Sequence, residues 1–341
     1  MIAKIASVMV LNLNGKRFLE ACFVSLEKQS RKDFETYLVD NGSTDGSVEF
    51  VGSRFPWVRI LPMGKNLGFS GAYNAAVGKV DAAYVVFLNN DTAVDEHWLE
   101  YLIAGAEECQ AALVGSKVLS YQEHDRVLSA GLMMTPAGVA YEAGLGEKDS
   151  PLYNVPKFVG GVTGASMLVR TDIFRAVGGF DEGYFAFCED LDLCWRLNLL
   201  GHKVLYEPRS VVYHWSGGTA GGILSGTRVY YMQKNMIRTA LKDFGSWRLM
   251  KALGIIFTYT LVRFFLYVFS GRFDLAGVLL AGSAEPVRHL PEILRQRSAV
   301  QKTRVVSDQQ LKERGWIASL GQSFREYVRT HSKTQAVVSY E

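Results

Sequence analysis

Short apolar segments alternate with segments of helical spacing over the first ninety residues of the chain. Apolar runs with the length of buried strands occur at residues 5–13, 34–39, 58–62 and 83–88. Helix-like spacing occurs between them, at residues 17–29, 43–51 and 69–77. This alternation predicts an α/β domain with a mostly parallel twisted sheet flanked by helices.

Polar clusters follow two of these strands. Asp40, Asn41, Ser43 and Asp45 come directly after the second strand, and Asn89-Asn90-Asp91 end the fourth. Ligands of such sheets bind beyond the carboxyl ends of the strands. A turn with a helix cap explains the first cluster equally well, and Asp91 fits either a helix cap or a ligand of a hard divalent cation.

Two further clusters carry groups suited to catalysis. Glu189, Asp190 and Asp192 open a helical segment directly after four aromatic residues, and apolar walls raise a carboxyl pKa towards that of a general base. Three acids in a first helical turn also simply favour the helix dipole. His214 follows a strand and precedes a glycine-rich loop, so it is either structural or a metal ligand with Asp91.

Composition fits a globular protein whose charge is unevenly distributed. Of the 341 residues, 48% are hydrophobic and 21% charged, and the four cysteines form no CxxC pair, which favours reduced thiols. The N-terminus is expected to be a strand and not an export signal. Before Gly226 there are 19 basic and 26 acidic residues, and from Gly226 on there are 18 and 8. No nucleic-acid motif is present, so the basic tail indicates an anionic membrane surface.

The clusters together resemble the family 2 glycosyltransferases with the GT-A fold, over about residues 4–240. The resemblance rests on DNGSTDGS from Asp40, NLGFSGAYNAA from Asn66, the NND variant of the metal-binding DxD motif, the ED-x-D-x-x-x-R segment and the late YHWSGGT histidine. Tyr230-Tyr231-x-x-Lys234-Asn235 is similar to a segment of bacterial rhamnosyltransferases. The resemblance implies a GT-A catalytic domain at residues 1–225 and a helical, membrane-associating region at 226–341.

The resemblance also implies roles for individual residues. Asp190 would be the catalytic base, with Glu189 and Asp192 orienting it or the acceptor, and Asp91 with His214 would hold Mg²⁺ or Mn²⁺. The residues expected to bind the nucleotide sugar are Asn12, Asn14, Asp40, Asn41, Ser43, Asp45, Asn66, Gly68, Asn74, Asn89 and Asn90. Those expected at the acceptor are Gly160, Gly161, Gly164 and Trp195. Asn89 stands where many relatives have a carboxylate, which leaves the metal less negative charge.

The activity implied is transfer of a single sugar, with inversion, from a nucleotide diphosphate sugar to a saccharide or polyprenyl-linked saccharide in cell-surface polysaccharide synthesis. Rhamnose from dTDP-rhamnose is the first choice of donor, and galactofuranose from UDP-galactofuranose the second. A non-catalytic nucleotide-sugar-binding scaffold and a nucleotidyltransferase are the alternatives from other classes. Intact Asp91, Asp190 and His214 argue against the scaffold.

The tail predicts where the enzyme acts. Residues 246–271 are apolar and aromatic, but Lys251 and Arg263 interrupt them, and a spanning helix needs about 20 apolar residues. We expect a helix in the interface, with Arg248, Lys251, Arg263 and Arg272 reaching headgroups on the cytoplasmic face of the plasma membrane, and residues 275–284 as a second arm. Deletion after Gly245 is then expected to preserve donor binding. The alternative is a helix buried against the catalytic domain or in a homodimer.

Overall fold

The computed structural model describes residues 4–215, 225–326 and 329. The N-terminal half alternates strands and helices as predicted: β1 (Ala6–Asn12), α1 (Lys16–Glu27), β2 (Phe34–Asp40), α2 (Ser47–Arg54), β3 (Arg59–Pro62), α3 (Gly68–Val77), β4 (Tyr84–Asn89), β5 (Thr92–Val94) and α4 (Trp98–Glu108). One bound is wrong: α2 begins at Ser47 and not at Ser43. Gly46 has φ +79°, so the chain is not helical before it.

The second half of the domain adds further strands and the helix that carries the acidic cluster. These elements are β6 (Leu113–Ser120), β7 (Val127–Ser129), β8 (Leu132–Met134), β9 (Ala140–Glu142), a 3₁₀ turn (Pro151–Tyr153), β10 (Lys157–Phe158), β11 (Ser166–Arg170), α5 (Thr171–Ala176), a second 3₁₀ turn (Glu182–Tyr184), α6 (Glu189–Leu199) and β12 (Val204–His214). The main sheet has the order β10-β12-β6-β11-β4-β1-β2-β3. β1, β2, β3 and β4 run parallel, as do β6 and β12, whereas β11 is antiparallel to both its neighbours.

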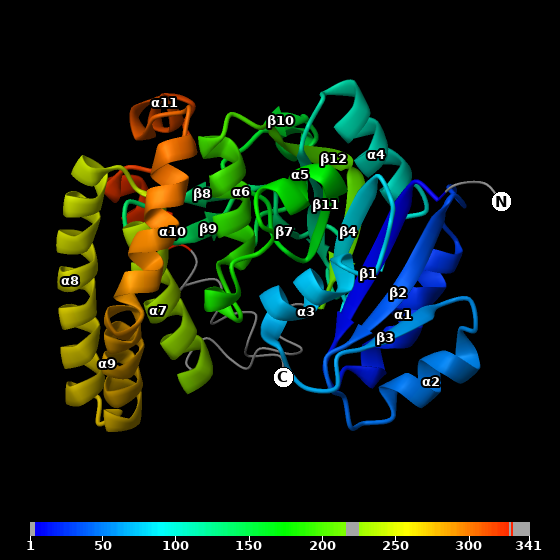
Figure 1. The fold of residues 1–341 in the computed structure, drawn as a ribbon, viewed down its shortest axis with the longest axis horizontal. Coiled ribbons are helices and arrows are strands. Elements are labelled where there is room, and N and C mark those ends of the chain that lie inside the picture. Colours follow the sequence, from blue (N-terminus) through cyan, green and yellow to red (C-terminus); the bar gives the residue numbers. More distant parts are fainter. Residues whose placement is uncertain (1–3, 216–224, 327–328, 330–341) are drawn as a thin grey trace.

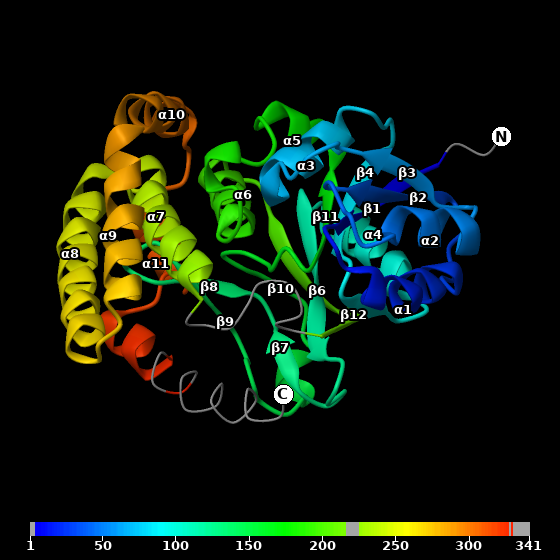
Figure 2. The ribbon, with the colours of Figure 1, turned by 90° about the horizontal axis from the view of Figure 1, so that it is seen from below.

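Helices cover both faces of this sheet (Figures 1 and 2). Val8 and Val10 of β1 pack in one buried cluster with α1, α2 and α4, while Met9 points to the other face, where α3, α5 and α6 pack. This alternation follows from the two-residue period of a strand. The sheet therefore has a core on each face, as the continuous apolar strands predict.

The helices that follow the sheet include α7 (Gly226–Asp243), α8 (Ser246–Phe269), α9 (Phe273–Arg288), α10 (Leu290–Thr303) and α11 (Asp308–Glu313). Figure 1 shows α8 and α9 side by side as a helical hairpin on the side of α7 and α10 that faces away from the sheet. The expected second arm of a hairpin is thus present. Among the residues that the structure describes, α8 is the one helix long and apolar enough to cross a membrane. An 18-residue stretch of it has a mean hydropathy of 1.8, and 11% of that stretch is buried.

The C-terminal helices share a core with α6, which we call the C-terminal core cluster. Its buried members are Leu132, Met134, Leu191, Trp195, Leu199, Met236, Ala240, Phe244, Ala252, Ile256, Val306, Leu311 and Ile317. Arg297 also donates to the carbonyl oxygens of Leu241 and Phe244 at the end of α7. A deletion after Gly245 would expose this core, so it does not test membrane binding alone.

Replacing Leu311 with alanine is expected to lower the free energy of unfolding by about 2–4 kcal/mol, because the side chain is fully buried in the C-terminal core cluster. Urea unfolding followed by fluorescence measures the change. Leu320→Ala is the control: that leucine is 60% exposed, and its loss should change stability by less than about 0.5 kcal/mol. Equal small effects would mean that the C-terminal helices do not stabilise the domain.

Candidate active site

The carboxyl ends of β1, β2 and β4 meet at one edge of the sheet. Asn12 of β1 lies opposite Asp40 of β2, and Leu11 lies opposite Asn89 of β4. Asn12 donates to the hydroxyl oxygen of Ser43 at 2.9 Å and accepts from the Asn90 side chain at 2.7 Å. The ends of three strands are therefore connected through side-chain amides.

The loop after β2 folds back onto the loop after β1. The Ser43 backbone N–H donates to the Asp40 carboxylate at 3.2 Å, and the Thr44 N–H donates to the Asn14 side chain at 2.7 Å. Asp45 accepts from the Lys16 N–H at the start of α1, at 2.9 Å. Asp40 is 5% exposed. These contacts give Asp40 and its loop one fixed shape at the predicted nucleobase position.

The start of α3 packs against the Asp40 loop. Asn41 donates to the Asn66 side chain at 3.0 Å and accepts from the Leu67 N–H at 2.8 Å. Gly68 has φ +72°, and a Cβ there would lie 2.4 Å from the carbonyl oxygen of Phe185, so no larger residue fits. Asn66 and Gly68 are thus placed beside the Asp40 loop.

Asn74, farther along α3, bonds to a different segment. Its amide donates to the Phe180 carbonyl oxygen at 2.8 Å and accepts from the Phe180 N–H at 3.0 Å. Both ends of the side chain are therefore used to hold the segment before α6. The expected role of Asn74 in lining the nucleotide pocket is corrected to a structural one.

Asp91 and His214 form a close pair. The Nε2 atom of His214 lies 3.1 Å from a carboxylate oxygen of Asp91, because β12 pairs with β5 and places His214 opposite Thr92. The glycine-rich residues 216–219 that follow lie outside the described residues. No group of three or more His, Cys, Asp or Glu side chains that could hold a metal occurs in the described part of the chain. Imidazole and carboxylate fit Mn²⁺ or Mg²⁺ only if the diphosphate completes the coordination.

Asp190 is linked to the end of β4 through the neighbouring residues Gly164 and Ala165. Its carboxylate accepts from the Gly164 N–H and the Leu191 N–H, both at 2.7 Å. The carbonyl oxygen of Ala165, the residue after Gly164, accepts from the Asn89 N–H at 3.0 Å. Burial raises the pKa of Asp190 above its ordinary value, against these hydrogen bonds, which lower it. Gly164, Asp190 and the Asn89–Asp91 segment therefore belong to one site.

Glu189 is buried beside Asp190. Its pKa is raised by burial and by the neighbouring Asp190 charge, and its Oε2 atom has no hydrogen-bond partner among the described residues. Two adjacent carboxyl groups with raised pKa values are typical of a catalytic site.

The backbone before these acids is strained. Phe185, Phe187 and Cys188 all have positive φ, between 60° and 67°. Asn235 of α7 donates to the carbonyl oxygens of Tyr184, Ala186 and Phe187, and so holds the strained segment. In the sequence, the importance of Asn235 was indicated by the similarity of residues 230–235 to a rhamnosyltransferase segment.

Asp192 lies on the other side of α6. It is fully buried, Arg196 donates to one carboxylate oxygen at 2.9 Å, and Lys242 of α7 contacts the other oxygen. Burial alone would raise the pKa of Asp192, but these two positive charges keep it below the ordinary value. Lys242 and Arg238 also bind Asp181. Asp192 therefore cannot touch an acceptor; it fixes α6 against α7.

Three of the four expected acceptor residues are also placed elsewhere. Trp195 is fully buried in the C-terminal core cluster. A Cβ at Gly160 would meet Trp316, and one at Gly161 would meet Cys194 and Leu132. These two glycines permit close packing and do not line an open floor. Only Gly164 reaches the site, through its N–H.

The comparison with protein families identifies the chain. The model for glycosyl transferase family 2 matches residues 7–178, more than half of the chain. The chain belongs to glycosyl transferase family 2. Asp190, Glu189 and His214 lie beyond the matched residues, so their roles rest on the geometry above.

Curated members of the family include rhamnosyltransferases. An N-acetylglucosaminyl-diphospho-decaprenol L-rhamnosyltransferase of Mycobacterium tuberculosis is 28% identical over 252 residues, 67% of this chain and 82% of the relative. The rhamnosyltransferase WbbL of Escherichia coli is 30% identical over 163 residues, 44% of this chain and 61% of the relative. The protein is therefore a family 2 glycosyltransferase of the bacterial rhamnosyltransferase-like type.

Solved structures agree with the GT-A fold. S. aureus TarS 1–349 has a TM-score of 0.53 at 16% identity, covering 91% of this chain and 92% of TarS. GalNAc-T7 with UDP, GalNAc and Mn²⁺ has a TM-score of 0.54 at 16% identity, covering 69% of this chain and 48% of GalNAc-T7. At such identities the likeness establishes the fold alone.

The two aspartates of α6 should respond in opposite directions to conversion to asparagine. Asp192→Asn leaves Arg196 and Lys242 without their shared carboxylate and should cost about 3–5 kcal/mol of stability at pH 7. The pKa of Asp192 is lowered by folding, so this stabilisation is present above about pH 4 and is lost as the pH falls towards the folded value. The pKa of Asp190 is raised, so its ionised form weakens the fold, and Asp190→Asn should leave stability at pH 7 unchanged or higher. Urea unfolding of both variants at pH 7 measures this, and a larger loss for Asp190→Asn would contradict it.

Proposed function

We propose that the protein transfers rhamnose from dTDP-rhamnose to a lipid-linked saccharide, with inversion at the sugar carbon. The observation that carries the proposal is the connection of Asp190, through Gly164 and Ala165, to the strand end at Asn89, two residues before Asp91. A buried carboxyl group with a raised pKa thereby lies at the same sheet edge as the Asp91–His214 pair and the Asp40 loop. The proposed positions of the base, the donor and the metal therefore lie at one edge of the sheet.

Donor binding is assigned to the sheet edge. The Asp40 carboxylate would accept from the imide N–H of thymine or uracil, while Asn41 and Asn66 shape the adjoining wall. Asp91 and His214 would hold Mg²⁺ or Mn²⁺, which when bound neutralises charge on the departing nucleoside diphosphate. The Asn90 side chain donates to Asn12, and Asp91 is the carboxylate of the NND segment.

Asp190 is assigned to the acceptor. Its ionised carboxylate takes the proton of the acceptor hydroxyl as that oxygen forms a bond to the anomeric carbon. The bond from that carbon to the diphosphate oxygen breaks at the same time, with its electron pair leaving on the nucleoside diphosphate. One displacement from the opposite side inverts the carbon, and Glu189 beside the base would orient the acceptor.

The relatives support the choice of sugar and acceptor. One relative is an N-acetylglucosaminyl-diphospho-decaprenol L-rhamnosyltransferase, and a second relative is also a rhamnosyltransferase. An acceptor of this class has a reactive hydroxyl on a sugar and a long apolar chain beyond a diphosphate. The protein surface should therefore provide a place for lipid near the base.

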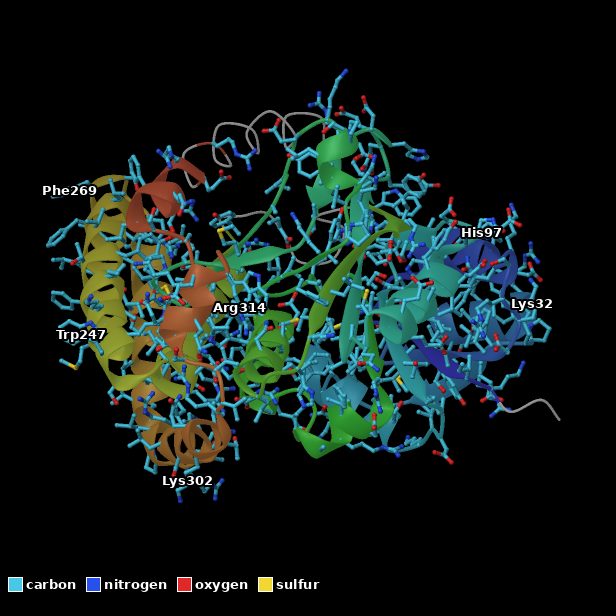
Figure 3. All side chains as sticks on the ribbon, turned by 90° about the horizontal axis from the view of Figure 1, so that it is seen from above. Lys32, His97, Trp247, Phe269, Lys302 and Arg314 are labelled. Carbon is cyan, nitrogen blue, oxygen red and sulfur yellow. The ribbon has the colours of Figure 1, made fainter. Side chains whose placement is uncertain are left out.

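The α8–α9 hairpin fits such a place on the cytoplasmic face of the membrane. Trp247 and Phe269, at the two ends of α8, are 75% and 83% exposed, and Figure 3 shows both pointing outward. The opposite side of α8 packs on the protein: Gln233 of α7 donates to Thr260 at 2.8 Å, and Ala252 and Ile256 are buried. A helix held along its length against α7 favours lying in the interface over crossing the bilayer.

The basic residues of this hairpin differ in their availability to headgroups. Arg248 donates to the carbonyl oxygen of Thr135 and lies over Phe244, so its predicted headgroup role is corrected to a packing contact. Arg272 pairs with Asp274 at 3.0 Å, which reduces its net charge. Lys251 over Trp247 and Arg263 beside Tyr267 retain the expected position.

Release of free nucleoside diphosphate across a panel of donors tests the function. With a lipid-linked saccharide acceptor, dTDP-rhamnose should be turned over fastest, and a chelator should abolish release. Asp190→Asn should lower kcat by roughly 10²–10⁴ with little change in donor KM. Because the pKa of Asp190 is raised, wild-type activity should fall as the pH drops through that raised value. Turnover in chelator would refute the metal, and a parallel loss of donor affinity in Asp190→Asn would move Asp190 into the donor site.

Vesicle binding tests the membrane surface. Lys251→Gln and Arg263→Gln should weaken binding to vesicles with anionic lipid by roughly fivefold per charge, and salt should have the same effect. Lys28→Gln and Lys32→Gln, on the far side of the sheet, are the control. If the intact protein ignores anionic vesicles and sediments as a dimer, the apolar face of α8 is a subunit interface.

A further inference from the structure

Arg228 is a half-buried cation at the start of α7. Its backbone N–H donates to the Ser225 side chain, which caps the helix. Its guanidinium lies 5.3 Å from the centre of the Phe187 ring, three residues before Asp190. Burial lowers the pKa of Arg228, so the charge has lost part of its hydration.

The neighbouring buried cations all have a carboxylate partner. Arg196 binds Asp192, Arg238 and Lys242 bind Asp181, and Lys234 lies 3.7 Å from Glu285. For Arg228, no ion pair and no side-chain hydrogen bond occurs within residues 4–215, 225–326 and 329. The connecting residues 216–224 contain neither Asp nor Glu.

A partly desolvated guanidinium without a counter-ion is unfavourable, and this one also lies against the segment before Asp190, so it fits an anion supplied by a ligand. A guanidinium presents planar pairs of N–H donors that match phosphate oxygens. The chemistry that Arg228 suits is therefore a phosphate or diphosphate group.

The position of Arg228 indicates which molecule carries that group. On one side lies the segment 185–188 that leads to the base, held to α7 by Asn235. On the other side the next residue, Val229, packs with Leu275 and Leu279 of α9 and with Phe264 and Tyr267 of α8. Figure 2 shows the first turns of α7 between α6 and the hairpin. Arg228 thus lies between the catalytic base and the apolar surface.

We propose that Arg228 binds the diphosphate that joins the acceptor sugar to its lipid. The inference rests on the proposed function and names the acceptor contact that the function leaves open. With the acceptor hydroxyl at Asp190 and the lipid on the hairpin, the linking diphosphate falls at Arg228. The donor's diphosphate is the other source of the same chemistry, but the proposed function assigns it to Asp91 and His214.

Steady-state kinetics with paired acceptors test the proposal. One acceptor is N-acetylglucosaminyl diphosphate with a short prenyl chain, and the other is an alkyl N-acetylglucosaminide that lacks the diphosphate. Arg228→Gln should raise the KM of the diphosphate acceptor roughly 10- to 100-fold, as expected for loss of a charge-assisted hydrogen bond, and leave the KM of the alkyl acceptor and of the donor unchanged. Farnesyl diphosphate, as a competitive inhibitor against the acceptor, should lose affinity by a similar factor.

Two further variants separate binding from folding. Arg228→Lys keeps the charge and should recover part of the lost affinity, while Arg295→Gln removes an exposed arginine of α10 and should behave as wild type. A rise in donor KM with equal effects on both acceptors would assign Arg228 to the donor's diphosphate and overturn the proposal. An unchanged KM for the diphosphate acceptor would overturn it as well. Failure of the proposed function itself is distinct, because then the wild-type enzyme turns over no donor.

Discussion

The buried ion cluster between α6 and α7 fixes the rest of the active site. Asp192 of α6 forms ion pairs with Arg196 of its own helix and with Lys242 of α7. Asp181 forms ion pairs with Lys242 and Arg238 of α7. Each of these charges costs free energy when its partners are absent, so the cluster is satisfied in one arrangement of the two helices. The helix α7 therefore packs as one unit with α6, and the expected domain boundary at residue 225 falls directly before it.

This cluster explains how two aspartates two positions apart acquire opposite properties. Residues i and i+2 point to different sides of a helix. Asp192 faces cations, which lower its pKa, while Asp190 faces Gly164 and the sheet edge, where burial raises its pKa. Rotation of α6 would exchange these environments, so the ion cluster on one side of the helix fixes the direction of Asp190 on the other. Asn235 adds a second constraint by stabilising the strained segment before α6.

The local pattern predicted the elements and the loops that gather at the sheet edge, because strand ends and glycine turns are properties of neighbouring residues. It placed the Asp40 loop, Asn66, Gly68, Asp91 and Asp190 at the sheet edge. The errors concern the sides of helices. Trp195, Asn74 and Asp192 lie next to functional residues in the sequence, yet their side chains point into packing contacts that involve residues far along the chain. Only the docking of α7 and the C-terminal helices shows which side of α6 is covered.

The C-terminal helices combine two requirements that the sequence suggested were separate. Their inner side completes the core beneath α6, and the outer side of α8 presents aromatic residues such as Phe269. A protein that binds a water-soluble nucleotide sugar and a lipid-linked acceptor needs a polar pocket and an apolar surface at a fixed separation. Asp190 lies on α6, Arg228 lies on α7, and α7 packs against the α8–α9 hairpin. Because one buried ion cluster joins α6 and α7, the distance from base to lipid surface would be set by the fold and not by a linker.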